Sequence, residues 1–199
     1  MTSQQNQSEI FWAEIAPCEH LVQIYEDDDV FLNSLEGYVA EGLKAGDAVI
    51  VIATASHRSA LETRLVASGV SLNIARARDQ YIALDTTETL SKFLVNGCPD
   101  EQRFEQLVIP LIERARQNNR RVRAFGEMVA LMWGQGLKDA TIQLEQLWHK
   151  LCHRKGFSLF CAYPKAGFTQ NASESIREIC QTHSRVVPEK MPCNCSEGI

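Results

Sequence analysis

Short apolar runs alternate with amphipathic stretches along most of this chain. The apolar runs have the length of β-strands and occupy residues 20–25, 48–53, 80–84, 122–125 and 157–162. Stretches with apolar residues at helical spacing occupy residues 27–45, 56–68, 100–118, 127–133, 137–153 and 173–183. The run AVIVIA at 48–53 contains no polar residue, as is typical of a strand buried on both faces. The pattern predicts five strands separated by helices.

Residues at the ends of the predicted helices support these boundaries. Three consecutive aspartates from Asp27 supply a cap and dipole partners for the first helix, and Gly46 follows its end. Asp85 and Glu88 have the spacing of a capping box, which predicts another helix directly after the third strand. Pro110 lies in the middle of a long helical stretch, where we expect a kink or a break.

The order of elements indicates the fold class. Helices between successive strands imply right-handed crossovers and a mainly parallel sheet, so we expect an α/β three-layer sandwich. A length of 199 residues fits one domain with tails. The expected parts are an N-terminal arm, a single domain and a flexible C-terminal tail, at residues 1–17, 18–187 and 188–199. Phe11, Trp12 and Ile15 are the residues that would pin the arm to the domain.

Charge and composition exclude several classes of protein. The formal charge is −5, which argues against direct nucleic-acid binding. The sequence contains neither a run of about 18 apolar residues nor a signal peptide, so we expect a cytoplasmic protein that does not contact a membrane. The seven cysteines are scattered and odd in number, so a disulfide framework is disfavoured.

Candidate ligand-binding residues follow the predicted strands. In open α/β sheets, ligands bind beyond the carboxyl ends of the strands. Those ends offer Tyr25-Glu26, Thr54 to His57, Asp85-Thr86, Gly126-Glu127 and Tyr163-Pro164. Glu127 and Asp85 are suited to acid–base chemistry or to holding a polar ligand. Alternatively, Asp85 caps the following helix and Glu127 stabilises the dipole of the next one.

Aromatic and histidine side chains add further candidates. Most of the aromatic and methionine residues at 125–148 are expected to be core, with Trp133 and Tyr163 the best suited to line a small-molecule pocket. His20 either faces a ligand or forms a hydrogen bond at a sheet edge.

Sequence motifs for nucleotide binding and covalent catalysis are absent. The chain lacks a Walker A loop, the G-x-G-x-x-G turn and the G-x-S-x-G elbow. The turn at residues 26–29 carries four carboxylates, which disfavours a standard P-loop ATPase. We expect neither a cofactor nor an enzymatic activity.

Two sets of residues have the chemistry of metal ligands, but their spacing favours other roles. Glu145, His149 and His153 form a row four residues apart, and this row lies off the apolar stripe of its helix, so we interpret it as a solvated face. A zinc set is also possible from Cys18, His20, Cys193 and Cys195. Its C-x-H and C-x-C spacings are not those of a zinc knuckle, so we expect independent thiols and no metal.

Several motifs resemble those of the MEDS (methanogen/methylotroph, DcmR sensory) domain family. They include HLVQIY at 20–25, EGLKAG at 41–46, YIALD at 81–85, RAFGEMVALMW at 123–133, LEQLW at 144–148, FSLFCAYP at 157–164 and HSRVVP at 183–188. The resemblance covers about residues 18–190, and the Phe-Gly-Glu-Met and Ala-Tyr-Pro segments are its most specific parts.

The resemblance implies a RecA/KaiC-like sheet without a phosphate loop, and a sensory role in signal transduction or transcriptional regulation. It implies a small organic, hydrocarbon-derived ligand at the strand ends. The matching site positions are His20, Tyr25, Asp85, Glu127, Trp133 and Tyr163. The expected tails are too short for an output domain, so we expect a separate kinase or regulator as partner, or self-association into a homo-oligomer.

Two alternatives remain at this point. One is a divergent RecA-like nucleotide hydrolase, in which Glu127 activates water and Asp85 holds magnesium. The other is an interaction scaffold that binds no small ligand.

Overall fold

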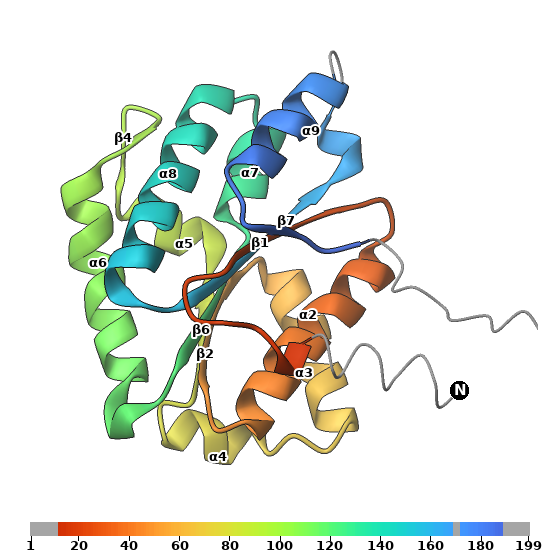
Figure 1. Cartoon of the computed structure of the whole chain (residues 1–199), viewed down its shortest axis with the longest axis vertical. Helices are drawn as coiled ribbons and strands as arrows, with labels where there is room; N and C mark the ends of the chain where they lie inside the picture. Colours follow the sequence, from red (N-terminus) through yellow and green to blue (C-terminus); the bar gives the residue numbers. More distant parts are fainter. Residues whose placement is uncertain (1–11, 169–171, 189–199) are drawn as a thin grey trace, which may run out of the picture.

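A six-stranded sheet between two layers of helices forms the body of the protein (Figure 1). The structure, a computed structural model, describes residues 12–168 and 172–188. The strands are β1 (His20–Tyr25), β2 (Ala48–Ala53), β3 (Tyr81–Asp85), β6 (Val122–Gly126), β7 (Ser158–Pro164) and β8 (Arg185–Val186). They lie in the order β3-β2-β6-β7-β1-β8, and every neighbouring pair is parallel. The predicted three-layer α/β sandwich with a mainly parallel sheet is confirmed.

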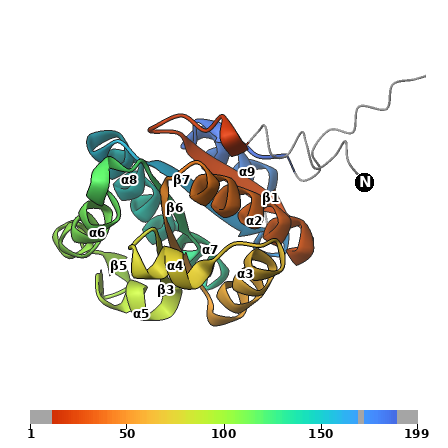
Figure 2. The same cartoon turned by 90° about the horizontal axis from the view of Figure 1, so that it is seen from below.

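The helices divide by position in the chain between the two faces of the sheet. One face carries α2 (Asp28–Lys44), α3 (Ala55–Ala67) and α4 (Leu72–Ala77). The other carries α5 (Thr86–Ser91), α6 (Glu101–Ala115), α7 (Met128–Gly134), α8 (Lys138–Lys155) and α9 (Ala172–Gln181). Seen from below, the sheet runs between these two layers (Figure 2). None of the helices among the described residues has the length and apolarity that crossing a membrane requires.

Each face of the sheet therefore has its own apolar core. Along β2, Val49 and Val51 pack against the α2–α4 layer, whereas Ile50 and Ile52 pack against the α5–α9 layer. All six residues of β2 are buried, as the AVIVIA run predicts. Because successive side chains of a strand alternate between faces, the position of a residue along the strand decides which of the two cores its side chain enters.

Four small elements are not predicted by the sequence pattern. They are β8, the helix α4, and a hairpin of β4 (Leu94–Val95) and β5 (Cys98–Pro99). Two short 3₁₀ turns, at Gln117–Asn119 and Lys165–Gly167, complete the elements. All of them span six residues or fewer, which is too short for a periodic pattern to be recognised.

The predicted break at Pro110 does not occur, because α6 continues through it from Glu101 to Ala115. Pro110 is exposed, so water can bond the carbonyl group that lacks an N–H partner.

The N-terminal segment is attached to the body at Trp12. This side chain is 1% exposed and packs edge-on against Tyr38, and its backbone oxygen accepts a bond from Arg123. Ile15 is buried as well. Phe11 and most of the predicted tail lie outside the described residues, and the domain boundaries stay a prediction.

Candidate functional site

A carboxylate lies at the point where the segments that follow two neighbouring strands turn to opposite faces of the sheet. β2 continues into α3 on one face, and β6 continues into α7 on the other, which makes this point a topological switch in the sheet. Glu127 follows β6 directly and is 7% exposed. Its Oε2 accepts a 2.7 Å hydrogen bond from the backbone N–H of Thr54, the residue that follows β2. The Glu127 carboxylate therefore bridges the ends of β2 and β6.

His57 is the second member of this strand-end pair. Its Nδ1 donates to Glu127 Oε1 at 2.7 Å, while its Nε2 lies 3.9 Å from Oδ2 of the largely exposed Asp28. The hydrogen bond to Glu127 raises the pKa of His57 above its usual value, against the effect of burial. The pair thus fixes the orientation of the imidazole, with its second nitrogen directed toward Asp28.

Aromatic rings line the inner side of the pair. The edge of Phe31 meets the His57 ring at a centroid distance of 5.1 Å, and Tyr25 stacks on Phe31 at 4.7 Å. Burial, together with the charges of Glu127 and Asp28, raises the pKa of Tyr25, so its hydroxyl stays protonated. The structure therefore brings together Tyr25 and Glu127, two of the residues that the sequence selects, on an apolar floor.

Asp85 lies on the neighbouring strand and serves as a helix cap. Its Oδ1 accepts the backbone N–H of Glu88 at 3.0 Å, and its Oδ2 lies 3.8 Å from Arg58. The interpretation of Asp85 as the cap of the following helix is confirmed.

His20 and Tyr163 lie on the opposite face of the sheet, around Glu145 of α8. We call the group formed by these three residues with Cys161 and His183 the buried polar cluster. Every side chain in it has an exposed fraction of 2% or less. The sequence interpretation of Glu145 as part of a solvated face is wrong, because residues of β1, β7 and the turn after α9 cover its side chain.

The contacts within the buried polar cluster converge on the Glu145 carboxylate. Its Oε2 lies 3.3 Å from His20 Nε2, 3.5 Å from His183 Nε2 and 3.7 Å from Cys161 Sγ. The hydroxyl of Tyr163 donates to the other oxygen, Oε1. Although burial opposes it, His183 and His20 together lower the pKa of Glu145, so the carboxylate is ionised.

The two histidines of the cluster differ in charge. Burial lowers the pKa of His20, which keeps this imidazole neutral. Burial also disfavours a charge on His183, but the nearby Glu145 outweighs it and raises the pKa of His183. A neutral and a readily charged imidazole thus share one carboxylate oxygen.

Trp133 has a packing role in the structure. Its side-chain N–H donates to the backbone oxygen of Gly167 at 3.0 Å, and its ring packs against Phe168 and the edge of Tyr163. It is 4% exposed and belongs to the core on the α5–α9 face.

The structure does not bring the six candidates together in one strand-end site, and their binding of a ligand stays a prediction. His20 and Tyr25 are five residues apart on one strand, so their side chains point to opposite faces. Tyr163 faces the side of His20, at the opposite face from Tyr25. His57 follows a predicted strand end, but it is not one of the six predicted site residues. Glu145, Cys161 and His183 were missed as partners, since no local pattern relates residues from three elements.

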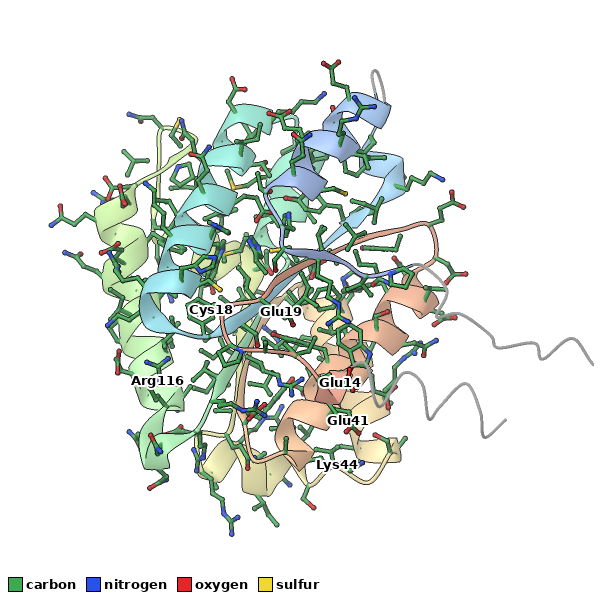
Figure 3. The ribbon with its side chains drawn as sticks, in the orientation of Figure 1. Glu14, Cys18, Glu19, Glu41, Lys44 and Arg116 are labelled. Atoms are coloured by element: carbon green, nitrogen blue, oxygen red, sulfur yellow. The ribbon has the colours of Figure 1, made fainter. Side chains whose placement is uncertain are left out.

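Of the zinc set considered from the sequence, Cys18 and His20 lie among the described residues. His20 contacts Glu145, Cys161 and His183. Cys18 lies on the segment that leads into β1, where its backbone N–H donates to Phe157 (Figure 3). Cys193 and Cys195 lie outside the described residues.

Comparison with known families gives a match over most of the chain. Residues 19–184 match the model of the family described as MEDS, the methanogen/methylotroph, DcmR sensory domain. This range contains both the Glu127–His57 pair and the whole buried polar cluster. No curated protein matches the chain.

Proposed function

The chain belongs to the MEDS family, and from this premise we propose that it is a sensor that binds a small organic ligand at the ends of β2 and β6 and signals through a separate partner protein. The observation that carries the proposal is the bridge made by Glu127. It fixes His57 at a topological switch point, where ligands of parallel α/β sheets bind. The membership supports the sensory role, and the pair supports its location.

The chemistry around His57 suits a short hydrocarbon derivative with one polar group. Such a ligand would exchange a hydrogen bond with His57 Nε2 and place its apolar part near the aromatic floor of Phe31 and Tyr25. An alcohol, an amine or an aldehyde has the required donor or acceptor. The strand-end site therefore favours small neutral or weakly basic molecules.

The same contacts supply a route for the signal. Glu127 bonds both to His57 and to the backbone of Thr54, where β2 ends and α3 begins. A ligand that moves His57 changes the strength of the bond from Glu127 to this turn. A change in the position of α3 is then available to a kinase or a transcriptional regulator that contacts this face.

The enzyme alternative assigns catalytic roles to Glu127 and Asp85, which already have other partners. In a nucleotide hydrolase Glu127 would activate water and Asp85 would hold magnesium. Glu127 is already bonded to Thr54 and His57, and Asp85 to the helix start and Arg58. These contacts favour a binding role, and we propose that the protein does not catalyse a reaction.

A thermal-shift and calorimetric screen of short alcohols, amines, aldehydes and halogenated hydrocarbons tests the proposal. We expect one class to bind the unaltered chain, and binding to be lost in Glu127→Gln and in His57→Gln. Asp85→Asn, at the neighbouring strand end, is the matched control and retains binding.

Two results would count against it. If no class binds and Glu127→Ala leaves a cellular response intact, the scaffold alternative replaces the sensor. ATP turnover that Glu127→Gln abolishes would establish the hydrolase alternative.

A further inference from the structure

The buried polar cluster gathers four side chains with metal-binding atoms in one place. His20 comes from β1, Cys161 from β7, Glu145 from α8, and His183 from the turn after α9. One nitrogen, sulfur or oxygen atom of each lies within 4.8 Å of all the others. Nothing in the proposed sensory function uses these atoms, and they lie on the opposite face of the sheet from the Glu127–His57 pair.

The orientation of His183 leaves a ligand atom without a hydrogen bond. Its Nδ1 donates to the backbone oxygen of Ile179 at 2.6 Å, so in the neutral ring the lone pair is on Nε2. Nε2 is buried and makes no hydrogen bond, yet it lies 3.5 Å from an oxygen of the Glu145 carboxylate. Two acceptors that face each other in a buried site require a cation between them, either a proton or a metal ion.

The separations between the four atoms favour a metal ion over a proton. A tetrahedral zinc ion with ordinary bond lengths sets its nitrogen and oxygen ligands about 3.3–3.5 Å apart, and its sulfur about 3.5–3.7 Å from either. His20 Nε2 and His183 Nε2 lie 3.3 and 3.5 Å from Glu145 Oε2. Cys161 Sγ lies 3.5 Å from His20 Nε2 and 3.7 Å from Glu145 Oε2. These four separations match edges of that tetrahedron, and the remaining two, from His183 to His20 and to Cys161, are within 4.8 Å. The two distances to nitrogen are also longer than good hydrogen bonds between nitrogen and oxygen.

We propose that His20, Glu145, Cys161 and His183 bind a divalent transition-metal ion of the zinc class. The donor set of two imidazoles, one thiolate and one carboxylate oxygen favours zinc over magnesium or calcium, which take oxygen ligands. On binding, the thiol proton of Cys161 and the proton held between His183 Nε2 and Glu145 pass to solvent, and the thiolate and the freed Nε2 enter the coordination sphere.

Groups around the four ligands have the arrangement of an outer coordination shell. Tyr163 donates to Oε1 of Glu145 and leaves Oε2 for the ion. The carbonyl of Ile179 orients His183, which is the usual partner arrangement of a ligating imidazole. Tyr163 is therefore a positioning residue of the site.

The site is closed, because the protein supplies four ligands and their side chains are buried. Closed four-ligand sites are structural, and this one would join three elements of the body to the turn after α9. At the same turn, Ser184 already exchanges hydrogen bonds with the backbone of His20. The metal thus fastens α9 and β8 to β1.

Metal content and cobalt substitution in the full 199-residue chain test this inference. After exhaustive chelation and reloading, we expect one tightly bound zinc per chain by elemental mass spectrometry. Replacement by Co²⁺ should give the visible bands of a tetrahedral site and a thiolate-to-cobalt charge-transfer band. Absence of tight metal binding, or of the charge-transfer band, would overturn the proposal without any variant.

Substitutions then locate the ion, with folding checked by circular dichroism. Cys161→Ser should abolish the charge-transfer band. Tyr163→Phe should weaken zinc binding by about 10–100-fold, as expected for a residue that orients a ligand, and His183→Ala by more. The exposed Cys98→Ser and His153→Ala are the matched controls and should bind normally.

The double variant Cys193→Ser/Cys195→Ser separates this site from the rival set in the sequence. It should keep both the zinc and the cobalt spectrum. Loss of the ion in this variant, with retention in Cys161→Ser, would refute the assignment. None of these measurements involves Glu127 or His57, so the result is independent of whether the strand-end site binds a ligand.

Discussion

Two buried glutamates show how single residues of this protein tolerate charge in an apolar setting. Glu127 receives a backbone N–H from Thr54 and an imidazole N–H from His57. Glu145 receives the Tyr163 hydroxyl and lies against two imidazoles. An isolated buried carboxylate is costly, so both positions depend on their partners.

The dependence of Glu127 on His57 gives a pH signature. The pKa of His57 is raised in the folded protein, so its protonated form stabilises the fold. This contribution is fully present below the unfolded pKa of 6.5 and is lost as pH rises through the higher folded value. We expect His57→Gln to lower the free energy of unfolding most in mildly acidic solution, and progressively less above neutrality, in urea titrations.

A double-mutant cycle isolates the pair. In a Glu127→Gln background, the effect of His57→Gln on the free energy of unfolding should lose this pH dependence. An unchanged profile would mean that the pair does not carry it.

The dependence of Glu145 on Tyr163 is tested by removing one hydroxyl. Tyr163→Phe leaves a buried carboxylate oxygen without its donor, and we expect metal-free protein to lose about 1–3 kcal/mol of unfolding free energy. Tyr81→Phe is the control, since its bond to Glu62 is long, at 3.4 Å, and partly exposed. Equal losses in the two variants would contradict a special role for the Tyr163 hydroxyl.

At the scale of elements, α2 packs so closely against β6 that it has no room for a larger side chain at position 42. Gly42 lies on the buried side of α2, where an added Cβ would come within 2.8 Å of Arg123 Cδ and 3.1 Å of Val49 Cγ2. Arg123 cannot move away freely, because it donates to Asp47 and to the backbone of Trp12.

This crowding reverses the usual effect of a glycine substitution in a helix. Gly42→Ala should destabilise the protein by about 1–3 kcal/mol, because the new methyl group overpacks the layer. Gly134→Ala, at the end of α7 with no atom within 4 Å, should leave stability unchanged or raise it by up to about 1 kcal/mol. Thermal unfolding of both variants makes the comparison, and a stabilising Gly42→Ala would show that α2 is packed less tightly.

The sequence predicts elements better than it predicts which of them meet. The long strands and helices appear with ends that shift by a few residues, because caps such as Asp27 and Asp85 and runs such as AVIVIA are local signals. The short β8 carries no such signal. The burial of Glu145 depends on His20 of β1, Tyr163 of β7 and His183 after α9, so its own helix could not reveal it.

At the scale of the whole molecule, the sheet separates two polar sites with different partners. The Glu127–His57 pair lies at a switch point beside α3, while the buried polar cluster lies under α8 and α9. The sequence places members of both sites near strand ends and predicts a single site, because only the alternation of side chains along β1 separates His20 from Tyr25. The family match covers both sites and supports a sensory role.

The N-terminal segment belongs to this molecular body. Trp12→Ala removes a ring that is 1% exposed and packs on Tyr38 and Phe160. We expect a loss of about 3–5 kcal/mol of unfolding free energy, as for other large core truncations. A loss below about 1 kcal/mol in chemical denaturation would mean that the segment contributes little.

The histidine resonances of the protein test the central claim, a ligand site at the ends of β2 and β6, most directly. Of the five histidines, His57 lies at the strand-end pair and the other four lie on α8 or around the buried polar cluster. In a titration of ¹⁵N-histidine-labelled chain with the small organic molecules, we expect one class to shift the His57 imidazole signals, and Glu127→Gln to abolish the shift. Compounds that leave His57 unchanged, or that shift the other four alone, would contradict the account.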